Sequence, residues 1–323
     1  MFNERPRSEY GHQARLKQTF KTALLVILAI ILCISLVFVL YGWKNKLGTE
    51  KKELLRLWDE GAYDKAFEQS RTGLEEKPMD YFLLTLHGFA SYQLAIAQIN
   101  NFDTLTYIDE CIWSLRKALQ VKNDANDGRL QYVLGKAYYY KGTGYADLAV
   151  QFLEEARDLS YNAVDIPEYL GLAYAAIQDY RSSVEAFSQA LVPQADDGGS
   201  TSDYPSDLLL LAIARSYIAL EEPETAMAYL LRCIETSRDS NTVIAGRLLL
   251  GDILAKAGKP EDAEAQFQAI LDEDGENAEA HFQLGELYEE RGNRTRARAE
   301  WRRAWNIDST HAKARERLAR LSN

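Results

Sequence analysis

The chain has 323 residues, of which 47% are hydrophobic, and a formal net charge of −11 at neutral pH. This supply of apolar residues, next to a charged fraction of 26%, excludes a largely disordered protein. The net negative charge argues against general nucleic-acid binding, because the phosphate backbone attracts basic surfaces.

An uncharged apolar segment at residues 22–42 follows a short basic tail at residues 1–21. At about 1.5 Å per residue the segment forms roughly 30 Å of helix, which is enough to cross a bilayer. A cleaved secretory signal needs a shorter apolar stretch that ends in small residues. A lipoprotein signal needs a small residue before its cysteine, whereas Leu32 precedes Cys33. We therefore expect residues 22–42 to be an uncleaved transmembrane anchor.

The orientation of this anchor is only weakly indicated by its flanks, because five basic residues precede it and five follow it. The acidic residues Glu50 and Glu53 dilute the positive charge on the C-terminal side. Tyr41 and Trp43 suit the membrane interface on that side. The flanks favour slightly an N-terminus in the cytoplasm.

A repeated pattern begins directly after the apolar segment. Residues 248–271 align with residues 282–305 so that Gly251 meets Gly285 and Phe267 meets Trp301, an offset of 34 residues. The same order of small and large positions recurs along the chain. It gives seven repeats, with starts near residues 47, 81, 128, 164, 207, 244 and 278.

Each repeat predicts two helices that pack against one another. A small residue in the first helix lets the second helix approach closely, and residues spaced by three and four share one helix face. The small position of the first helix holds Leu54, Gly88, Gly135, Gly171, Ala214, Gly251 and Gly285. The large position of the second helix holds Ser70, Leu115, Leu153, Phe187, Leu230, Phe267 and Trp301.

This pattern resembles the tetratricopeptide repeat over residues 47–311. The resemblance implies an all-α fold, a right-handed superhelical solenoid of helical hairpins, preceded here by one transmembrane helix. Residues 312–323 fit a C-terminal capping helix with Ala314, Leu318 and Leu321 on one side.

Two repeats are longer than the others. The extra length before the repeat at 207 matches a polar segment at residues 194–205, which predicts a surface loop. The second repeat carries extra residues before Cys111, and we expect a lengthened first helix and a longer turn there.

The resemblance also implies a concave groove that binds partner proteins through positions two, five, nine and twelve of each repeat. Rings at these positions suit peptide or helix capture, but packing against the lengthened second repeat is left open as an alternative. Further along, Asp252, Glu286 and Glu289 make the groove polar. The predicted groove residues are Trp58, Phe82, Phe89, Tyr92, Tyr132, Lys136, Tyr139 and Arg215.

Some proteins of this family bind the C-terminal carboxylate of a partner with a Lys and, four residues later, an Asn in the groove. Here the residue four positions after Lys51 is Leu55, and Thr85 and Phe89 occupy the same two positions of the next repeat, so this binding mode is not expected. The C-terminal end is basic, since residues 291–320 hold ten Lys and Arg against Glu300, Asp308 and Glu316. It either docks an acidic partner or an anionic lipid surface, or forms a solvated cap. Its predicted surface residues are Arg294, Arg298, Arg302, Arg303 and Arg315.

The sequence shows no catalytic constellation, no phosphate-binding loop and no metal-ligand spacing, so we expect neither an enzyme nor a cofactor. His87 and His281 occupy packing positions, and Cys111 and Cys233 fall at buried helix positions.

The resulting hypothesis is a membrane-anchored scaffold that assembles a cell-envelope complex, with an accessory subunit of a secretion machine as the alternative. Bacterial inner-membrane proteins with one span and a periplasmic repeat domain match this layout. Protein partners and the membrane are expected, nucleic acid is not, and self-association is left open.

Overall fold

The computed structural model describes residues 50–97, 101–122, 127–191 and 207–320. The predicted anchor at 22–42 and the predicted loop at 194–205 lie outside these residues. Within the described ranges, no helix combines the length and the apolar character that a membrane span requires.

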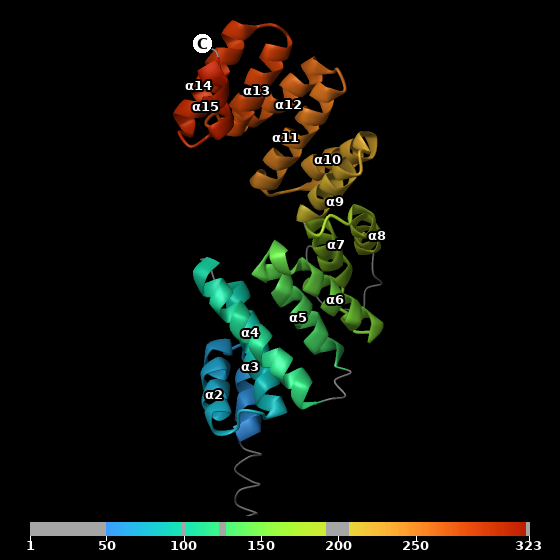
Figure 1. The fold of residues 1–323 in the computed structure, drawn as a ribbon, viewed down its shortest axis with the longest axis vertical. Coiled ribbons are helices and arrows are strands. Elements are labelled where there is room, and N and C mark those ends of the chain that lie inside the picture. Colours follow the sequence, from blue (N-terminus) through green and yellow to red (C-terminus); the bar gives the residue numbers. More distant parts are fainter. Residues whose placement is uncertain (1–49, 98–100, 123–126, 192–206, 321–323) are drawn as a thin grey trace, which may run out of the picture.

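All regular elements of the described residues are helices. The helix at 50–59 and α2 to α14 pair into seven antiparallel hairpins, and α15 packs on the last of them (Figure 1). The first hairpin joins the helix at residues 50–59 to α2. The remaining bounds are α2 Tyr63–Glu76, α3 Tyr81–Ala97, α4 Asn101–Val121, α5 Gly128–Lys141, the 3₁₀ turn Thr143–Tyr145, α6 Ala146–Asp158, α7 Ile166–Ala176, α8 Tyr180–Ala190, α9 Asp207–Ala219, α10 Pro223–Thr236, α11 Ser240–Lys256, α12 Pro260–Glu273, α13 Ala278–Glu290, α14 Arg294–Ile307 and α15 Ala312–Arg320.

The two helices of a hairpin interlock through the predicted small and large positions. A Cβ atom on Gly285 would lie 2.4 Å from the Trp301 ring, far inside van der Waals contact. Only glycine therefore lets these two helices come so close. The same short approach joins Gly88 to Leu115, Gly135 to Leu153, Gly171 to Phe187 and Gly251 to Phe267.

Hairpins stack in chain order, so that each packs on the next. First helices also touch across successive hairpins, as α3 does with α5 and α5 with α7. They form the inner face of a solenoid, which is the expected arrangement for helical repeats. Figure 1 shows α2 near one end of the long axis and α14 with α15 at the other.

The sequence predicts a lengthened first helix and a longer turn for the second hairpin. Its first helix α3 is longer, with 17 residues against 14 in α5, but most of the other extra residues extend the second helix. Helix α4 begins at Asn101, well before Cys111, and has 21 residues. This extension holds no glycine or proline, and it buries Ile108 completely while Tyr107 packs edge-on against Phe67. The added turns are helical because they cover α2 and α3.

Helix α15 closes the described part of the solenoid. Its Ala314 is fully buried, and its Leu318 packs into the same apolar cluster as Trp301. Leu321, the third predicted capping residue, lies outside the described residues. Helix α11 starts at Ser240, four residues before the expected repeat start, because the Asp239 side chain accepts the amide of Thr242 as an N-cap.

Candidate functional site

A groove of about 620 Å³ runs along the inner face of the first three hairpins, and we call it the aromatic groove. Its walls come from the helix at 50–59, from α3 and from α5, with Tyr161 at one edge. No residue of the lengthened α4 lines it, so the described part of the insertion does not fill the groove. The structure brings together Trp58, Phe82, Phe89, Tyr92, Tyr132 and Lys136, as predicted from repeat positions.

Aromatic and aliphatic side chains form the floor of the aromatic groove. The Trp58 and Phe89 rings lie 6.2 Å apart between centroids, at an angle of 47°. Leu55 and Ile96 border the groove with 46% and 49% of their surface exposed. Apolar side chains left open to solvent in a concave surface are typical of a binding site.

One end of the aromatic groove is held by a largely buried ion pair. The Lys136 ammonium donates to Asp165 at 2.7 Å and to the Tyr132 hydroxyl oxygen at 3.0 Å. The Tyr132 hydroxyl donates in turn to Asp165 at 2.7 Å. The ammonium also sits 4.3 Å from the Tyr169 ring centroid. These contacts tie α5 to the start of α7 and fix the rings that form this end of the groove.

The hydroxyl groups around this ion pair stay protonated. Burial raises the pKa of Tyr132 well above its usual value, and the Asp165 carboxylate adds to the effect. Burial likewise raises the pKa of Tyr92 and of Tyr169. A protonated phenol can donate to Asp165, so the hydrogen bonds persist across the physiological pH range.

Two predicted groove residues lie elsewhere. Tyr139 faces α7, where its ring meets Tyr169 edge-on at 5.3 Å. Arg215 is exposed on α9, in a different part of the solenoid from the aromatic groove. The predicted set also leaves out several lining residues. Leu55 and Arg129 stand at repeat positions nine and two but are not among the predicted groove residues, whereas Ile96 at the extended end of α3 and Tyr161 after α6 lie outside the four positions.

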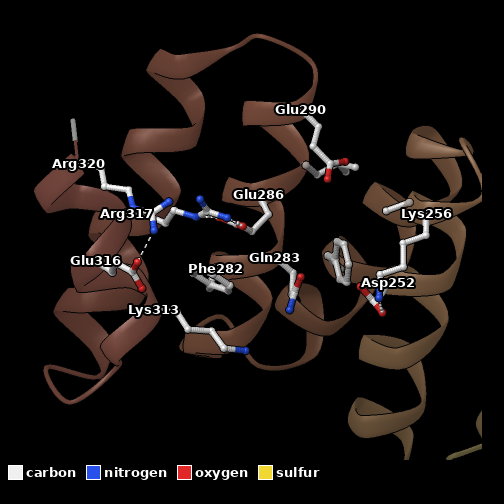
Figure 2. Close-up of a pocket in the computed structure, with 13 residues that line it drawn as sticks. Asp252, Lys256, Phe282, Gln283, Glu286, Glu290, Lys313, Glu316, Arg317 and Arg320 are labelled. Carbon is white, nitrogen blue, oxygen red and sulfur yellow. Dashed lines mark hydrogen bonds and ion pairs between the residues drawn. The ribbon is translucent and has the colours of Figure 1, made fainter. Parts of the chain in front are cut away.

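The inner face of the last hairpins is charged instead of aromatic. A cavity of about 400 Å³ lies between α11, α13 and α15 (Figure 2). Across it, the Arg317 guanidinium of α15 makes two contacts with Glu286 of α13, one of them 2.8 Å long. On α11, Lys256 pairs with Asp252 at 2.7 Å. Asp252 and Glu286, predicted as polar groove residues, therefore hold cationic partners from the chain itself.

The predicted basic residues are all exposed, four on α14 and one on α15. Arg303 pairs with Glu300 on its own helix. Arg294 has only a long contact of 3.9 Å to Glu289. Arg298, Arg302 and Arg315 are not ion-paired within the described residues.

One side-chain set has the composition of a catalytic triad. Ser70 Oγ lies 2.9 Å from His87 Nδ1, and His87 Nε2 lies 3.7 Å from Glu110. Ser70 is completely buried, however, and its hydroxyl donates to the Phe67 carbonyl at 2.9 Å. A substrate cannot reach this oxygen, so the set works as a packed polar contact between α2, α3 and α4.

Comparison with known proteins supports the repeat assignment. Tetratricopeptide-repeat family models match residues 209–240 and residues 248–310. No curated protein sequence matches the chain.

Solved structures of tetratricopeptide-repeat proteins share the fold. The C-terminal part of such a protein from Cytophaga hutchinsonii is 14% identical, with a TM-score of 0.57, over 82% of this chain and 98% of that one. A tetratricopeptide-repeat protein from Parabacteroides merdae is 17% identical, with a TM-score of 0.51, over 85% of this chain and 100% of that one. The chain thus carries tetratricopeptide repeats at residues 209–240 and 248–310, and its fold is an all-helical solenoid like those of the two solved structures.

Proposed function

We propose that this chain is a scaffold, not an enzyme, and that its aromatic groove binds a segment of a partner protein. Tetratricopeptide-repeat solenoids mediate protein–protein interactions through extended concave surfaces. The observation that carries the proposal is the aromatic groove, which leaves Leu55 and Ile96 half exposed beside Trp58 and Phe89. Tyr and Trp bury a large area at a low entropic penalty, as binding hot spots do.

The groove suits an apolar segment that is held by side-chain contacts. Its volume of about 620 Å³ accommodates several side chains. The buried Lys136–Asp165 pair preorganises one end, so the rings there lose little freedom when a partner binds. Rigid aromatic walls favour capture of a segment without rearrangement of the solenoid.

The membrane part of the proposal rests on the sequence. The uncharged segment at 22–42 ends shortly before the first described helix at residue 50, so it would hold the aromatic groove near a bilayer. We place the anchor in a bacterial inner membrane, with the solenoid in the periplasm. Protease treatment of cells with a permeabilised outer membrane tests this orientation. Digestion of the solenoid supports it, and protection until lysis contradicts it.

Site-specific crosslinking tests the groove. A photoreactive phenylalanine at Phe89, inside the aromatic groove, is expected to capture a partner protein in cells. Phe102, which is 79% exposed on α4 and does not line the groove, is the matched control position. Equal crosslinking from both positions, or none from Phe89, would contradict the proposal.

Replacement of the exposed groove residues provides a second test. Leu55→Ser together with Ile96→Ser is expected to abolish the Phe89 crosslink. The same change should lower the free energy of unfolding by only about 1.5–3 kcal/mol, because both side chains are half exposed. A partner that still crosslinks fully to this variant would place its binding outside the groove.

An accessory role in protein secretion is the alternative function. It predicts that the Phe89 crosslinker captures many newly exported chains. A scaffold of a fixed complex predicts the same few partners under all growth conditions, which mass spectrometry of the crosslinked products distinguishes.

A further inference from the structure

Of the ten basic residues at 291–320, seven fall into two groups that differ in their ion pairs. In one group each guanidinium pairs with a carboxylate: Arg291 with Glu261 and Glu264, Arg303 with Glu300, Arg317 with Glu286, and Arg320 with Glu316. The other group follows one side of α14 at intervals of one turn, at Arg294, Arg298 and Arg302. We call these three residues the arginine stripe. Within the described residues, its only ion pair is the 3.9 Å contact of Arg294, whose side chain is 80% exposed. Of the other three basic residues, Arg296 and Lys313 lie over the rings of Tyr288 and Phe282, and Arg315 has no ion pair within the described residues.

The arginine stripe works against the stability of its own helix. Like charges four residues apart repel, so Arg298 disfavours both of its neighbours in the stripe. Arg294 also stands in the first turn, where the helix dipole is positive and favours acidic residues. Helix α12 shows the usual choice, with Glu261 and Asp262 in its first turn. Helix stability therefore does not explain the stripe.

The position of the stripe narrows the choice of ligand. Helix α14 lies at the end of the solenoid opposite α2 (Figure 1), whereas the proposed anchor at 22–42 precedes the first hairpin in the sequence. This placement disfavours the lipid surface of the same membrane. Nucleic acid is disfavoured because residues 43–290 carry a large net negative charge that repels phosphate.

The spacing of the stripe points to a helical protein ligand. Residues four apart on a helix are about 6 Å apart along its axis. Carboxylates four residues apart on a second helix have the same spacing, so an acidic helix laid along α14 can meet each guanidinium in turn. Arginine also binds carboxylates with two parallel hydrogen bonds, which lysine cannot do.

We propose that the arginine stripe of α14 is a second docking surface, and that it binds an acidic helical segment of a partner protein. This inference is independent of the aromatic groove, because no residue of α14 lines that groove. A solenoid with docking surfaces at both ends can hold two partners at once.

Binding of synthetic peptides to the purified full-length chain tests the inference. The probe is a fluorescent alanine-rich helical peptide with glutamate at every fourth position, and a peptide with lysine in place of glutamate is the control. Arg298→Glu with Arg302→Glu is expected to weaken binding of the acidic peptide by about tenfold or more. Arg181→Glu with Arg232→Glu makes the same charge change at two exposed arginines on α8 and α10, and should leave binding within about twofold.

Several outcomes would overturn the inference. Equal losses in the stripe variant and the control variant would mean that only net charge matters. Tighter stripe-dependent binding of a single-stranded oligonucleotide, or of vesicles containing phosphatidylserine, would replace the protein ligand by another class. Self-association that the stripe variant abolishes in sedimentation would make a second copy of the chain the occupant.

Thermal unfolding adds a test that does not need a ligand. Arg298→Gln with Arg302→Gln removes the repulsion along α14 and is expected to unfold at the same or a higher temperature. A clear decrease would show that these arginines stabilise the fold, and would contradict a binding role.

Discussion

The N-terminal and C-terminal hairpins use aromatic residues in opposite places. In hairpins two and three, leucines fill the contact with the helix glycine, as Leu115 does against Gly88, and rings line the inner face. In hairpins six and seven, the rings of Phe267 and Trp301 fill that contact, and the inner face carries ion pairs. The fold needs a large side chain at the interlock but does not need rings on the inner face. The rings of the aromatic groove are therefore not required by the interlock, which agrees with the binding role that we propose for this groove.

Substitution of the interlocking glycines should have the largest effect. Gly285→Ala places a Cβ atom 2.4 Å from the rigid Trp301 indole, and we expect it to lower the free energy of unfolding by about 3 kcal/mol. Gly88→Ala faces the flexible end of Leu115 and should cost only about 1–2 kcal/mol. Denaturant unfolding measures both. Gly275→Ala, whose Cβ atom would lie 3.6 Å from the Leu271 carbonyl oxygen, is the neutral control. If both variants lose the same free energy of unfolding, then a ring and a leucine facing the glycine do not differ in how well they tolerate the added methyl group.

Ion pairs should also differ between the two regions. Asp165→Asn leaves the Lys136 ammonium, with a side chain only 11% exposed, without its carboxylate, and we expect a loss of about 2 kcal/mol. Asp252→Asn breaks the pair with Lys256, which is 74% exposed, and should cost less than about 0.5 kcal/mol. Denaturant unfolding at low and high salt compares the two variants. A larger loss for Asp252→Asn would contradict a structural role for the buried pair.

A smaller, pH-dependent effect is expected in the first two hairpins. Burial lowers the pKa of His87, so the folded state favours its neutral form. The stability this provides is present above the unfolded pKa of about 6.5, and is lost as pH falls from there toward the lower folded pKa. The slope is at most about 1.4 kcal/mol per pH unit. Hydrogen exchange of α2 and α3 between pH 7 and pH 5 measures it.

His87→Gln keeps a polar side chain but does not titrate, so it should remove this part of the pH dependence. An unchanged profile in that variant would assign the dependence to other groups. The C-terminal hairpins are an internal reference, since their exchange should not change with the variant.

Much of the fold follows from the repeat pattern in the sequence. The small and large positions predict the interlocks at Gly171 and Gly251 because close helix contacts admit few residue types. The pattern does not predict the length of α4, because its first turns hold packing residues such as Tyr107 and Ile108 that lie outside the repeat. Tertiary contact with α2 and α3 decides that these residues are helical.

The candidate site is predictable only in part. Repeat positions find most of the aromatic groove, because residues on one face of the first helices must line the inner surface. They misplace Tyr139, since its direction depends on packing against Tyr169 of the next hairpin. Repeat positions also do not predict that Arg303 forms an ion pair and Arg298 does not, because ion pairing depends on which carboxylates the folded chain brings near each guanidinium.

The interlock of glycine and ring constrains how this sequence can diverge. A side chain at Gly251 or Gly285 clashes with the facing ring, and loss of the ring leaves a cavity beside a bare glycine. A substitution of the glycine alone, or of the facing ring alone, thus lowers the stability of the fold. Homologous chains should therefore show correlated substitutions at the two positions of each hairpin, while residues of the inner face vary independently. Each hairpin is in this sense inherited as one unit, whose inward-facing side chains are free to diverge toward new partners.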